Sequence, residues 1–422
     1  MSVYRYRDLL WDLTHEGAGR QGEIKLRVFS NEQEMYETEW GYKQTIPITL
    51  PQHWFEVSRT SRAHWTRSRA PRDVMMELGW LMWRSIPPEP KRSLLTATPD
   101  QPCRLKISSN SPAIDDLPWE WLNDGAGPPF ALRPEIRLAR SVPIRMAMPP
   151  KNIQLPLRVL LVITNPKDER LLDPEQEIEA VSPRLRTRPY ALMILEEPTW
   201  DALNAVLRHE PPHIVHYIGH AGINRGEGNL ILHKSDNMTH WISGPELSSA
   251  LPPTVKLLSL GTCFTAPNYQ ILGLSRLAHT SAMYRLPTAV ANRYPVEGKS
   301  VEMFWGGFYS SLADHGNVNE AFYQAQQAVA REPDSEADWG SFSLAIRDQS
   351  GEVFRLEKAG TRSAQKHAEE IQAQLASGLA NDLAEQIFSL GSRAPGSIKR
   401  HFEQEAAAAS ELTANLTEWD QS

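Results

Sequence analysis

Four predominantly apolar runs constrain the fold of this 422-residue chain more than any other feature. They are LRVLLVIT at 157–164, HIVHYIG at 213–219, VKLLSL at 255–260 and TAVAN at 288–292. Strands that are buried on both faces of a parallel sheet have this pattern, because neither face needs polar residues. Segments that suit crossover helices accompany the runs, among them DPEQEIEAVSPRL, VEMFWGGFYSSLAD and NEAFYQAQQAVAR. The pattern predicts a three-layer α/β/α domain from about residue 155 to about residue 355.

Residues 1–150 have a mixed pattern. The runs EIKLRVF (23–29) and TIPITL (45–50) alternate as strands do, whereas DVMMELGWLMWRSI (73–86) has helical periodicity. We therefore expect an N-terminal α+β region that leads into the central domain.

The last part of the chain, from 359 to 422, is rich in Ala, Gln, Glu and Lys. Apolar residues recur every four positions from Ile371 to Ile387, which places them on one face of a helix. Such a face docks either on the chain's own domain or on a partner protein. We expect the central domain to span 151–358, followed by C-terminal helices that serve association or regulation rather than chemistry.

The formal net charge of -7 and the pI near 6.0 argue against a nucleic-acid-binding role, because phosphate contacts need clustered Lys and Arg. The stretch SRTSRAHWTRSRAPR (58–72) is a local exception, with five arginines around Trp65. It is either a solvated basic loop or a sensor surface.

No stretch approaches the ~20 consecutive apolar residues that cross a bilayer. The N-terminus MSVYRYRDLLWDL also lacks the charged-then-apolar pattern of a secretory signal. The two cysteines, Cys103 and Cys263, are too few for a disulfide framework and form no CxxC pair for zinc. We expect a cytoplasmic protein without membrane contact, metal or organic cofactor, in which Cys103 is a buried core thiol.

His220 and Cys263 each follow one of the apolar runs. HIVHYIGHAG ends a predicted strand at Gly219, and KLLSLGTCFTAP ends the next one just before Cys263. Loops at the carboxyl ends of parallel strands gather residues that are distant in sequence. A nearby imidazole raises the reactive fraction of a thiol, so the two side chains suit a catalytic pair. Spacing alone does not identify such a pair, and a satisfied loop histidine with a core thiol is the alternative.

A larger series of motifs surrounds these two. DLPWEWLND (116–124) and LARSVP (138–143) precede HIVHYIGHAG, and GEGNLILH, PELSSAL, VKLLSLGTCFTA and FYSSLADHGNVNEAFYQAQQAV follow it in order. The series resembles that of CHAT domains, the caspase-like family related to separases and caspases, from about residue 75 to about residue 355. The resemblance implies a caspase-like α/β fold and cysteine peptidase chemistry, with His220 as the base and Cys263 as the nucleophile.

The acyl intermediate of such a reaction needs an oxyanion hole, and we expect backbone N–H groups of Ala221, Gly222 and Cys263 to form it. Ala221 is a departure, because many relatives have a second glycine at this position. The methyl group of Ala221 leaves the backbone N–H available.

Two charged residues near the TAVAN strand are candidates for the S1 pocket, which would bind the P1 side chain of a substrate. Arg293 would favour an acidic P1 residue and Glu297 a basic one. RYPVEG (293–298) aligns with a Trp-Pro-Val-Asp run in relatives, which puts Glu297 at the acid position and favours a basic P1. Each charge has the alternative of being a solvated loop residue, or of pairing with the other.

Histidine and tryptophan motifs offer rival interpretations. His216 and His220 share a strand face, but no third zinc ligand with suitable spacing accompanies them, so we expect no metal site. His213 and His216 are expected to be structural. Trp119 and Trp121, in the PWEW run, are expected to pack in the core rather than to form an aromatic cage.

We therefore expect a caspase-like cysteine endopeptidase that cleaves protein substrates. The resemblance implies a triggered effector of a bacterial, antiviral defence system, with a substrate encoded nearby and a sensor or regulatory protein as partner. Tetratricopeptide repeats, which relatives often carry, are not visible in the sequence, and homo-oligomerisation is left open. The alternative is a catalytically silent CHAT scaffold that binds proteins, which the presence of both His220 and Cys263 disfavours.

Overall fold

The computed structural model of the protein describes most of the chain between residues 6 and 356. The described ranges are 6–18, 21–31, 42–48, 72–109, 111–141, 151–153, 155–169, 174–186, 190–224, 227–261, 278, 286–294, 296, 298–333, 337–347 and 353–356. The predicted C-terminal helices, most of the basic stretch 58–72, Cys263 and Glu297 therefore lie outside the described residues.

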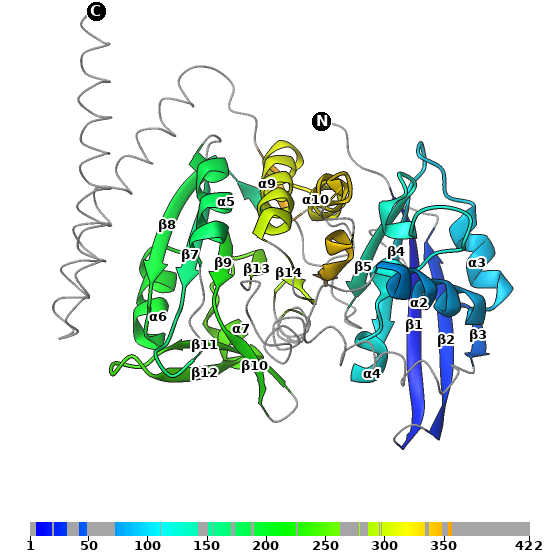
Figure 1. Ribbon diagram of the computed structural model, residues 1–422, viewed down its shortest axis with the longest axis horizontal. Coiled ribbons are helices and arrows are strands. Elements are labelled where there is room, and N and C mark those ends of the chain that lie inside the picture. Colours follow the sequence, from blue (N-terminus) through cyan, green and yellow to red (C-terminus); the bar gives the residue numbers. More distant parts are fainter. Residues whose placement is uncertain are drawn as a thin grey trace, which may run out of the picture.

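Most strands of the described residues belong to one sheet. They are β1 (Arg7–Ala18), β2 (Gln21–Asn31), β3 (Tyr42–Ile48), β4 (Cys103–Ser109), β5 (Ile136–Ser141), β7 (Leu157–Ile163), β8 (Tyr190–Glu196), β9 (Ile214–Ile218), β13 (Leu257–Gly261), β14 (Thr288–Asn292) and β15 (Phe342–Ile346). Within these ranges the sheet is 11-stranded, in the order β3-β2-β1-β4-β5-β15-β14-β13-β9-β7-β8 (Figure 1). All four apolar runs are strands of it, as predicted, and they pair in parallel.

Helices cover both faces of the central strands (Figure 1). They are α5 (Glu175–Arg186), α9 (Gly298–His315) and α10 (Val318–Ala330) on one face, and α6 (Trp200–His209) and α7 (Gly244–Ala250) on the other. Successive residues of a strand point to opposite faces, so Val159 belongs to the apolar cluster that includes Phe304 of α9, and Leu160 to the cluster that includes Leu203 of α6. The predicted three-layer α/β/α fold is confirmed.

The N-terminal region continues the same sheet rather than forming a separate one. Its strand β5 pairs in parallel with β15, where Ala345 lies opposite Arg140. Around it lie α2 (Arg72–Ser85), α3 (Pro88–Leu95), α4 (Pro112–Asp115), and the short 3-10 helices η1 (Trp119–Trp121), η2 (Phe130–Leu132) and η4 (Asp338–Ser341). The α+β pattern expected here is present, and the domain boundary at 150 stays a prediction.

Two small sheets complete the described structure. One consists of β10 (Ala221–Asn224), β11 (Glu227–His233) and β12 (Thr239–Ser243), which are antiparallel and begin directly after His220. In the other, β6 (Lys151–Ile153) pairs in parallel with β16 (Phe354–Leu356). A search of the described helices finds none with the length and apolarity to cross a membrane.

Helix α2 packs closely on the PWEW segment through a glycine. A Cβ atom on Gly79 would lie 1.8 Å from the backbone oxygen of Trp121. The side-chain nitrogen of Asn123 donates to that oxygen and to the carbonyl of Met76, which ties the helix to the segment. Trp119 and Trp121 are each 1% exposed, so the prediction that they pack in the core is confirmed.

This contact reverses the effect that replacing a helical glycine by alanine usually has on stability. Gly→Ala inside a helix ordinarily stabilises by about 1 kcal/mol, but Gly79→Ala should destabilise by about 1–3 kcal/mol, because the methyl group collides with backbone rather than with a movable side chain. Urea unfolding measures the change, with Glu77→Ala, at an exposed position of the same helix, as the control. A Gly79→Ala variant as stable as the wild type would contradict the packing.

Candidate functional site

The carboxyl ends of β9 and β13 form the edge at which the sequence places its catalytic pair. The register pairs Ile218 with Gly261. His220 comes two residues after Ile218, and its side chain is fully buried. Cys263 comes two residues after Gly261 in the sequence and lies outside the described residues. The structure thus brings together the strands that precede the two residues, and the pairing of His220 with Cys263 stays a prediction.

Both strands end in glycine, and we call Gly219 and Gly261 the glycine pair. The N–H of Gly219 donates to the carbonyl of Gly261 at 3.4 Å, which continues the ladder beyond the strand ends. A Cβ atom on Gly219 would lie 2.1 Å from Oγ1 of Thr164, and one on Gly261 would lie 1.8 Å from Oε1 of Glu177. Polar side chains therefore occupy the space beside each glycine, and no other residue type fits at either position without a shift.

Thr164 and Tyr217, which we call the hydroxyl cluster, lie beside Gly219. Their hydroxyl oxygens are 2.9 Å apart, and the Tyr217 hydroxyl also contacts the backbone carbonyls of His220 and Ile231. Burial raises the pKa of the Tyr217 phenol far above its usual range, so it stays a neutral hydrogen-bond donor. The cluster fixes the backbone at His220 from the face of the sheet that α6 and α7 cover.

Glu177, His216, Ser259 and Tyr309, which we call the carboxylate cluster, lie on the opposite face. Nε2 of His216 is 3.2 Å from Oε1 of Glu177, and Nδ1 is 2.7 Å from the hydroxyl of Tyr309. The Tyr309 hydroxyl also bonds Ser259 at 3.1 Å, and burial raises its pKa above the usual range. His216 is thus a structural residue, as expected.

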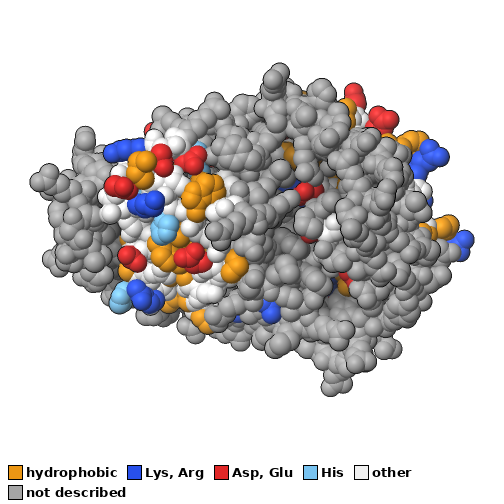
Figure 2. Space-filling view, turned by 90° about the horizontal axis from the view of Figure 1, so that it is seen from below, with side chains coloured by type: hydrophobic (Ala, Val, Ile, Leu, Met, Phe, Trp, Pro, Cys, Tyr) orange, Lys and Arg blue, Asp and Glu red, His pale blue; other side chains and the backbone are white. Residues whose placement is uncertain are grey.

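The predicted oxyanion residues Ala221 and Gly222 lie in β10, a strand that the sequence analysis did not identify. Gly222 pairs with Asn229 of β11, and a Cβ atom on Gly222 would lie 2.5 Å from the indole of Trp241 on β12. That indole is 37% exposed. Figure 2 shows a face of the molecule where hydrophobic side chains stand among charges of both signs. The oxyanion role of the two N–H groups stays a prediction.

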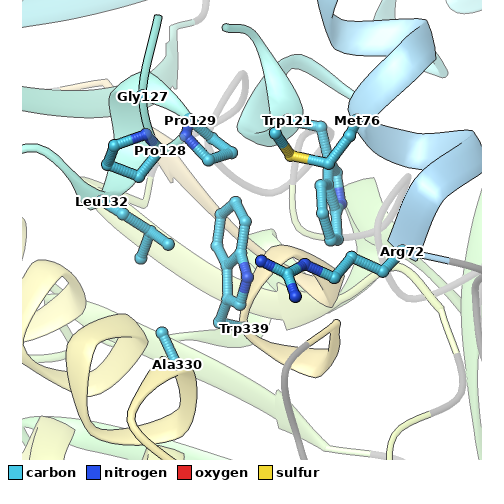
Figure 3. A pocket seen from close by; sticks show the side chains of 9 residues that line it. All are labelled: Arg72, Met76, Trp121, Gly127, Pro128, Pro129, Leu132, Ala330 and Trp339. Atoms are coloured by element: carbon cyan, nitrogen blue, oxygen red, sulfur yellow. The ribbon is translucent and has the colours of Figure 1, made fainter. Parts of the chain in front are cut away.

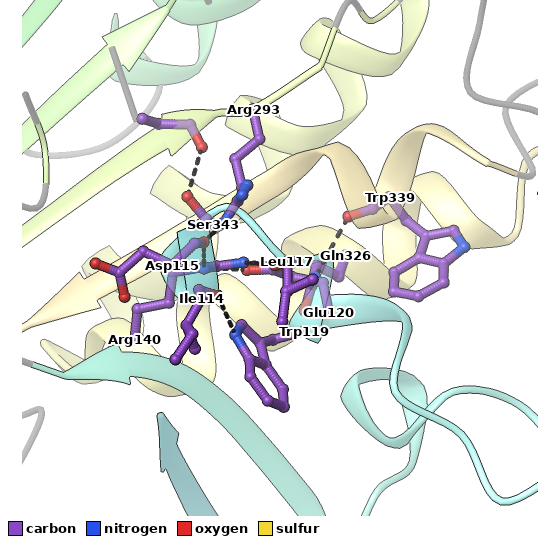
Figure 4. A network of polar contacts seen from close by, with 11 residues as sticks. Ile114, Asp115, Leu117, Trp119, Glu120, Arg140, Arg293, Gln326, Trp339 and Ser343 are labelled. Carbon is purple, nitrogen blue, oxygen red and sulfur yellow. Dashed lines mark hydrogen bonds and ion pairs between the residues drawn. The ribbon is translucent and has the colours of Figure 1, made fainter. Parts of the chain in front are cut away.

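Arg293, the first S1 candidate, lies inside a buried ionic network (Figure 4). It is 2% exposed, and its guanidinium donates to the carbonyl of Asp115. Arg140 donates to the same carbonyl and binds both carboxylate oxygens of Glu120, at 2.7 and 2.8 Å. Burial opposes the charge of Arg293, but Tyr294 and nearby carboxylates outweigh it and raise the pKa of the guanidinium. A substrate role for Arg293 stays a prediction, and this network is an unexpected alternative to it.

A cavity of about 300 Å³ lies beside the PWEW segment (Figure 3). Its lining comes from α2, η1, η2, α10 and η4 and includes Arg72, Trp121 and Trp339. None of the predicted catalytic or substrate-binding residues lines it, so it is not part of the candidate site.

The remaining sequence expectations concern metals and the second thiol. Within the described ranges, no group of three His, Cys, Asp or Glu side chains is arranged to hold a metal ion. His213 accepts a hydrogen bond from the N–H of Arg158 through Nδ1, which is the structural role expected for it. Cys103 is a buried free thiol, as predicted, and burial raises its pKa to about 11.

The fold is of the α/β class, and the candidate catalytic residues follow the carboxyl ends of the parallel strands β9 and β13 in the sequence. The model of the CHAT domain matches residues 78–348, well over half of the chain, and the chain belongs to this family. The family resemblance carried by the sequence motifs is therefore confirmed.

The chain is also similar to several solved cysteine protease structures. The Arg-specific cysteine proteinase gingipain R (RGPB) is 10% identical with a TM-score of 0.37, covering 69% of this chain and 73% of that chain. The separase–securin complex of Saccharomyces cerevisiae is 11% identical with a TM-score of 0.37, covering 74% and 23%. Caspase-1 from Spodoptera frugiperda is 13% identical with a TM-score of 0.28, covering 49% and 99%. No curated protein matches the sequence.

The network around Glu120 gives a pH-dependent prediction. Burial alone would raise the pKa of Glu120, but Arg140 and Arg293 outweigh it and lower that pKa below its ordinary 4.5. The carboxylate therefore contributes stability that is complete above pH 4.5 and is lost as the pH falls through the lower, folded pKa.

Glu120→Gln should destabilise the protein by about 3–5 kcal/mol at neutral pH, because it leaves buried guanidinium charge uncompensated. The difference from the wild type should shrink in acid, where the wild-type carboxyl also becomes neutral. Urea unfolding as a function of pH measures both effects, with Glu77→Gln at an exposed position as the control. A difference that does not depend on pH would contradict the assigned charge.

Proposed function

We propose that this CHAT protein is a cysteine endopeptidase that cleaves protein substrates through His220 and Cys263. The observation that carries the proposal is the register of β9 and β13, in which Ile218 lies opposite Gly261. Each predicted catalytic residue follows its strand end by two positions. In a parallel pair this spacing brings both residues to the same edge of the sheet.

The chemistry follows from these two groups. The imidazole of His220 accepts the thiol proton of Cys263, and the thiolate attacks the carbonyl carbon of the scissile peptide bond. Backbone N–H groups of Ala221, Gly222 and Cys263 donate to the oxyanion. His220 then returns the proton to the leaving amine, and a water molecule hydrolyses the thioester that remains, which regenerates the thiol.

For specificity, we favour Glu297 over Arg293 as the charge that meets the P1 side chain. The guanidinium of Arg293 already lies among Asp115, Glu120 and Tyr294, and it is 2% exposed. Turning it toward a substrate would leave the charge of Glu120 less compensated. A carboxylate at Glu297 would select a basic P1 residue.

We further propose that the enzyme is a cytoplasmic, triggered effector of a bacterial antiviral defence system. Its protein substrate and a sensor or regulatory partner would be encoded nearby. The support for this setting is the family resemblance. Association through the C-terminal helices, including with a second copy, belongs to the same proposal.

The complete burial of His220 favours a second candidate function, a catalytically silent scaffold. A peptide cannot reach an imidazole that has no exposed surface, so the arrangement described here is not one that binds substrate. Cleavage of a peptide bond by the chain would distinguish the peptidase from the scaffold.

Cys263→Ala should abolish cleavage of a protein or peptide substrate while leaving the fold intact, because the nucleophile is lost. His220→Ala should reduce kcat by a similar factor. Cys103→Ala is the matched control and should keep full activity, because a buried thiol with a pKa of about 11 is not a nucleophile. Undiminished proteolysis by purified Cys263→Ala protein would exclude the dyad.

A library of fluorogenic peptides varied at P1 tests the specificity. We expect kcat/KM to be highest for Arg or Lys and to fall in Glu297→Gln, because an unpaired charge in the pocket is costly. Preference for Asp would assign the pocket to Arg293 instead. Preference for an apolar residue would remove both charges from it.

A further inference from the structure

The glycine pair lies between two buried polar clusters that come from opposite faces of the sheet. A side chain at position 219 would point to the same face of the sheet as Tyr217, two residues before it. A side chain at position 261 would point to the same face as Ser259. The hydroxyl cluster fills the space beside Gly219, and the carboxylate cluster fills the space beside Gly261. The two strand ends that lead to the dyad are therefore fixed from both sides.

The carboxylate of Glu177 is costly to bury and only partly satisfied. Its side chain is 3% exposed, and Oε1 bonds His216. Oε2 is buried, makes no hydrogen bond to the described residues, and would lie 2.8 Å from a Cβ atom on Gly261. Glu177 lies in the first turn of α5, where the helix macrodipole favours an acid. That effect is smaller than the cost of burying a carboxylate with one unsatisfied oxygen. A buried acid beside the strand that leads to the nucleophile therefore needs a functional reason.

Tyr217 lies beside Gly219, on the face of the sheet opposite Glu177. Its hydroxyl bonds the carbonyl of His220 itself, and the carbonyl of Ile231 at 2.7 Å. The N–H of Ile231 donates to the same His220 carbonyl, so one hydroxyl and one β11 amide together determine where the backbone of His220 lies.

We propose that Tyr217 and Glu177 are positioning residues of the dyad. They fix the glycine pair, and with it the ends of the two strands that precede His220 and Cys263 in the sequence. This inference rests on the proposed function. Neither residue touches the reacting atoms, so both act through the backbone.

The reactivity of Cys263 toward iodoacetamide tests the proposal without a substrate. The measurement uses the full chain carrying Cys103→Ala, in which Cys263 is the single thiol. The alkylation rate is recorded as a function of pH, which reports the thiolate fraction. In this parent protein we expect an alkylation midpoint well below the ordinary thiol value of about 8.5, and its loss in His220→Ala.

Tyr217→Phe and Glu177→Gln should each slow alkylation at pH 7 by about tenfold to a hundredfold and move the midpoint toward the ordinary thiol value. Two matched controls should leave the profile unchanged. Ser343→Ala also removes a buried hydroxyl that bonds a backbone carbonyl, that of Ala291, at 3.3 Å, and it contacts neither cluster. Glu179→Gln changes an exposed acid on the same helix as Glu177.

The outcomes separate the inference from the proposed function. A parent midpoint that does not depend on His220 would overturn the dyad itself. A parent midpoint that depends on His220 but is unchanged in Tyr217→Phe and Glu177→Gln would overturn the positioning role alone. A purely structural role would lower the melting temperature in Tyr217→Phe and Ser343→Ala alike, without moving the midpoint.

If Tyr217→Phe does not fold, Thr164→Val replaces it. This variant removes the hydroxyl that contacts Tyr217 and keeps the side-chain shape. The same shift of the alkylation midpoint is expected, and an unchanged midpoint would again overturn the positioning role.

Discussion

The parallel pairing of β9 with β13, extended by the bond from Gly219 to Gly261, is the interaction on which the candidate site depends. Parallel strands deliver their following loops to one edge, so this single register determines which distant residues can meet. Both positions are glycine because side-chain oxygens of Thr164 and Glu177 occupy the space a Cβ atom would need. The polar clusters on the two faces thus determine the residue type at the strand ends.

A second network joins the N-terminal region to the same sheet. Arg140 of β5 binds Glu120, and Arg293, which follows β14, donates to the carbonyl that Arg140 also contacts. Breaking one partner of a buried network leaves the others uncompensated, so these segments can only move together. The CHAT match, residues 78–348, includes every residue of this network.

Much of the fold could be predicted from the sequence, because strands buried on both faces leave continuous apolar runs. The strand β8 (Tyr190–Glu196), at the edge of the sheet, was missed although it begins with six consecutive apolar residues, YALMIL. The pairing of β5 with β15 and the contact of Glu177 with Gly261 could not be predicted, because each joins segments far apart in sequence. The burial of Arg293 was missed for the same reason: a charge after a strand resembles a loop residue until Glu120 is placed beside it.

The burial of His220 limits how the proposed peptidase could become active. Its carbonyl is bound on one side by Tyr217 and on the other by the N–H of Ile231 in β11. Tyr217 and the β11 residues Leu230 and Leu232 belong to the same buried apolar cluster, so the carbonyl of His220 is held between two buried elements. A trigger that exposes the imidazole must therefore overcome the burial of β11 as well as the hydrogen bond from Tyr217.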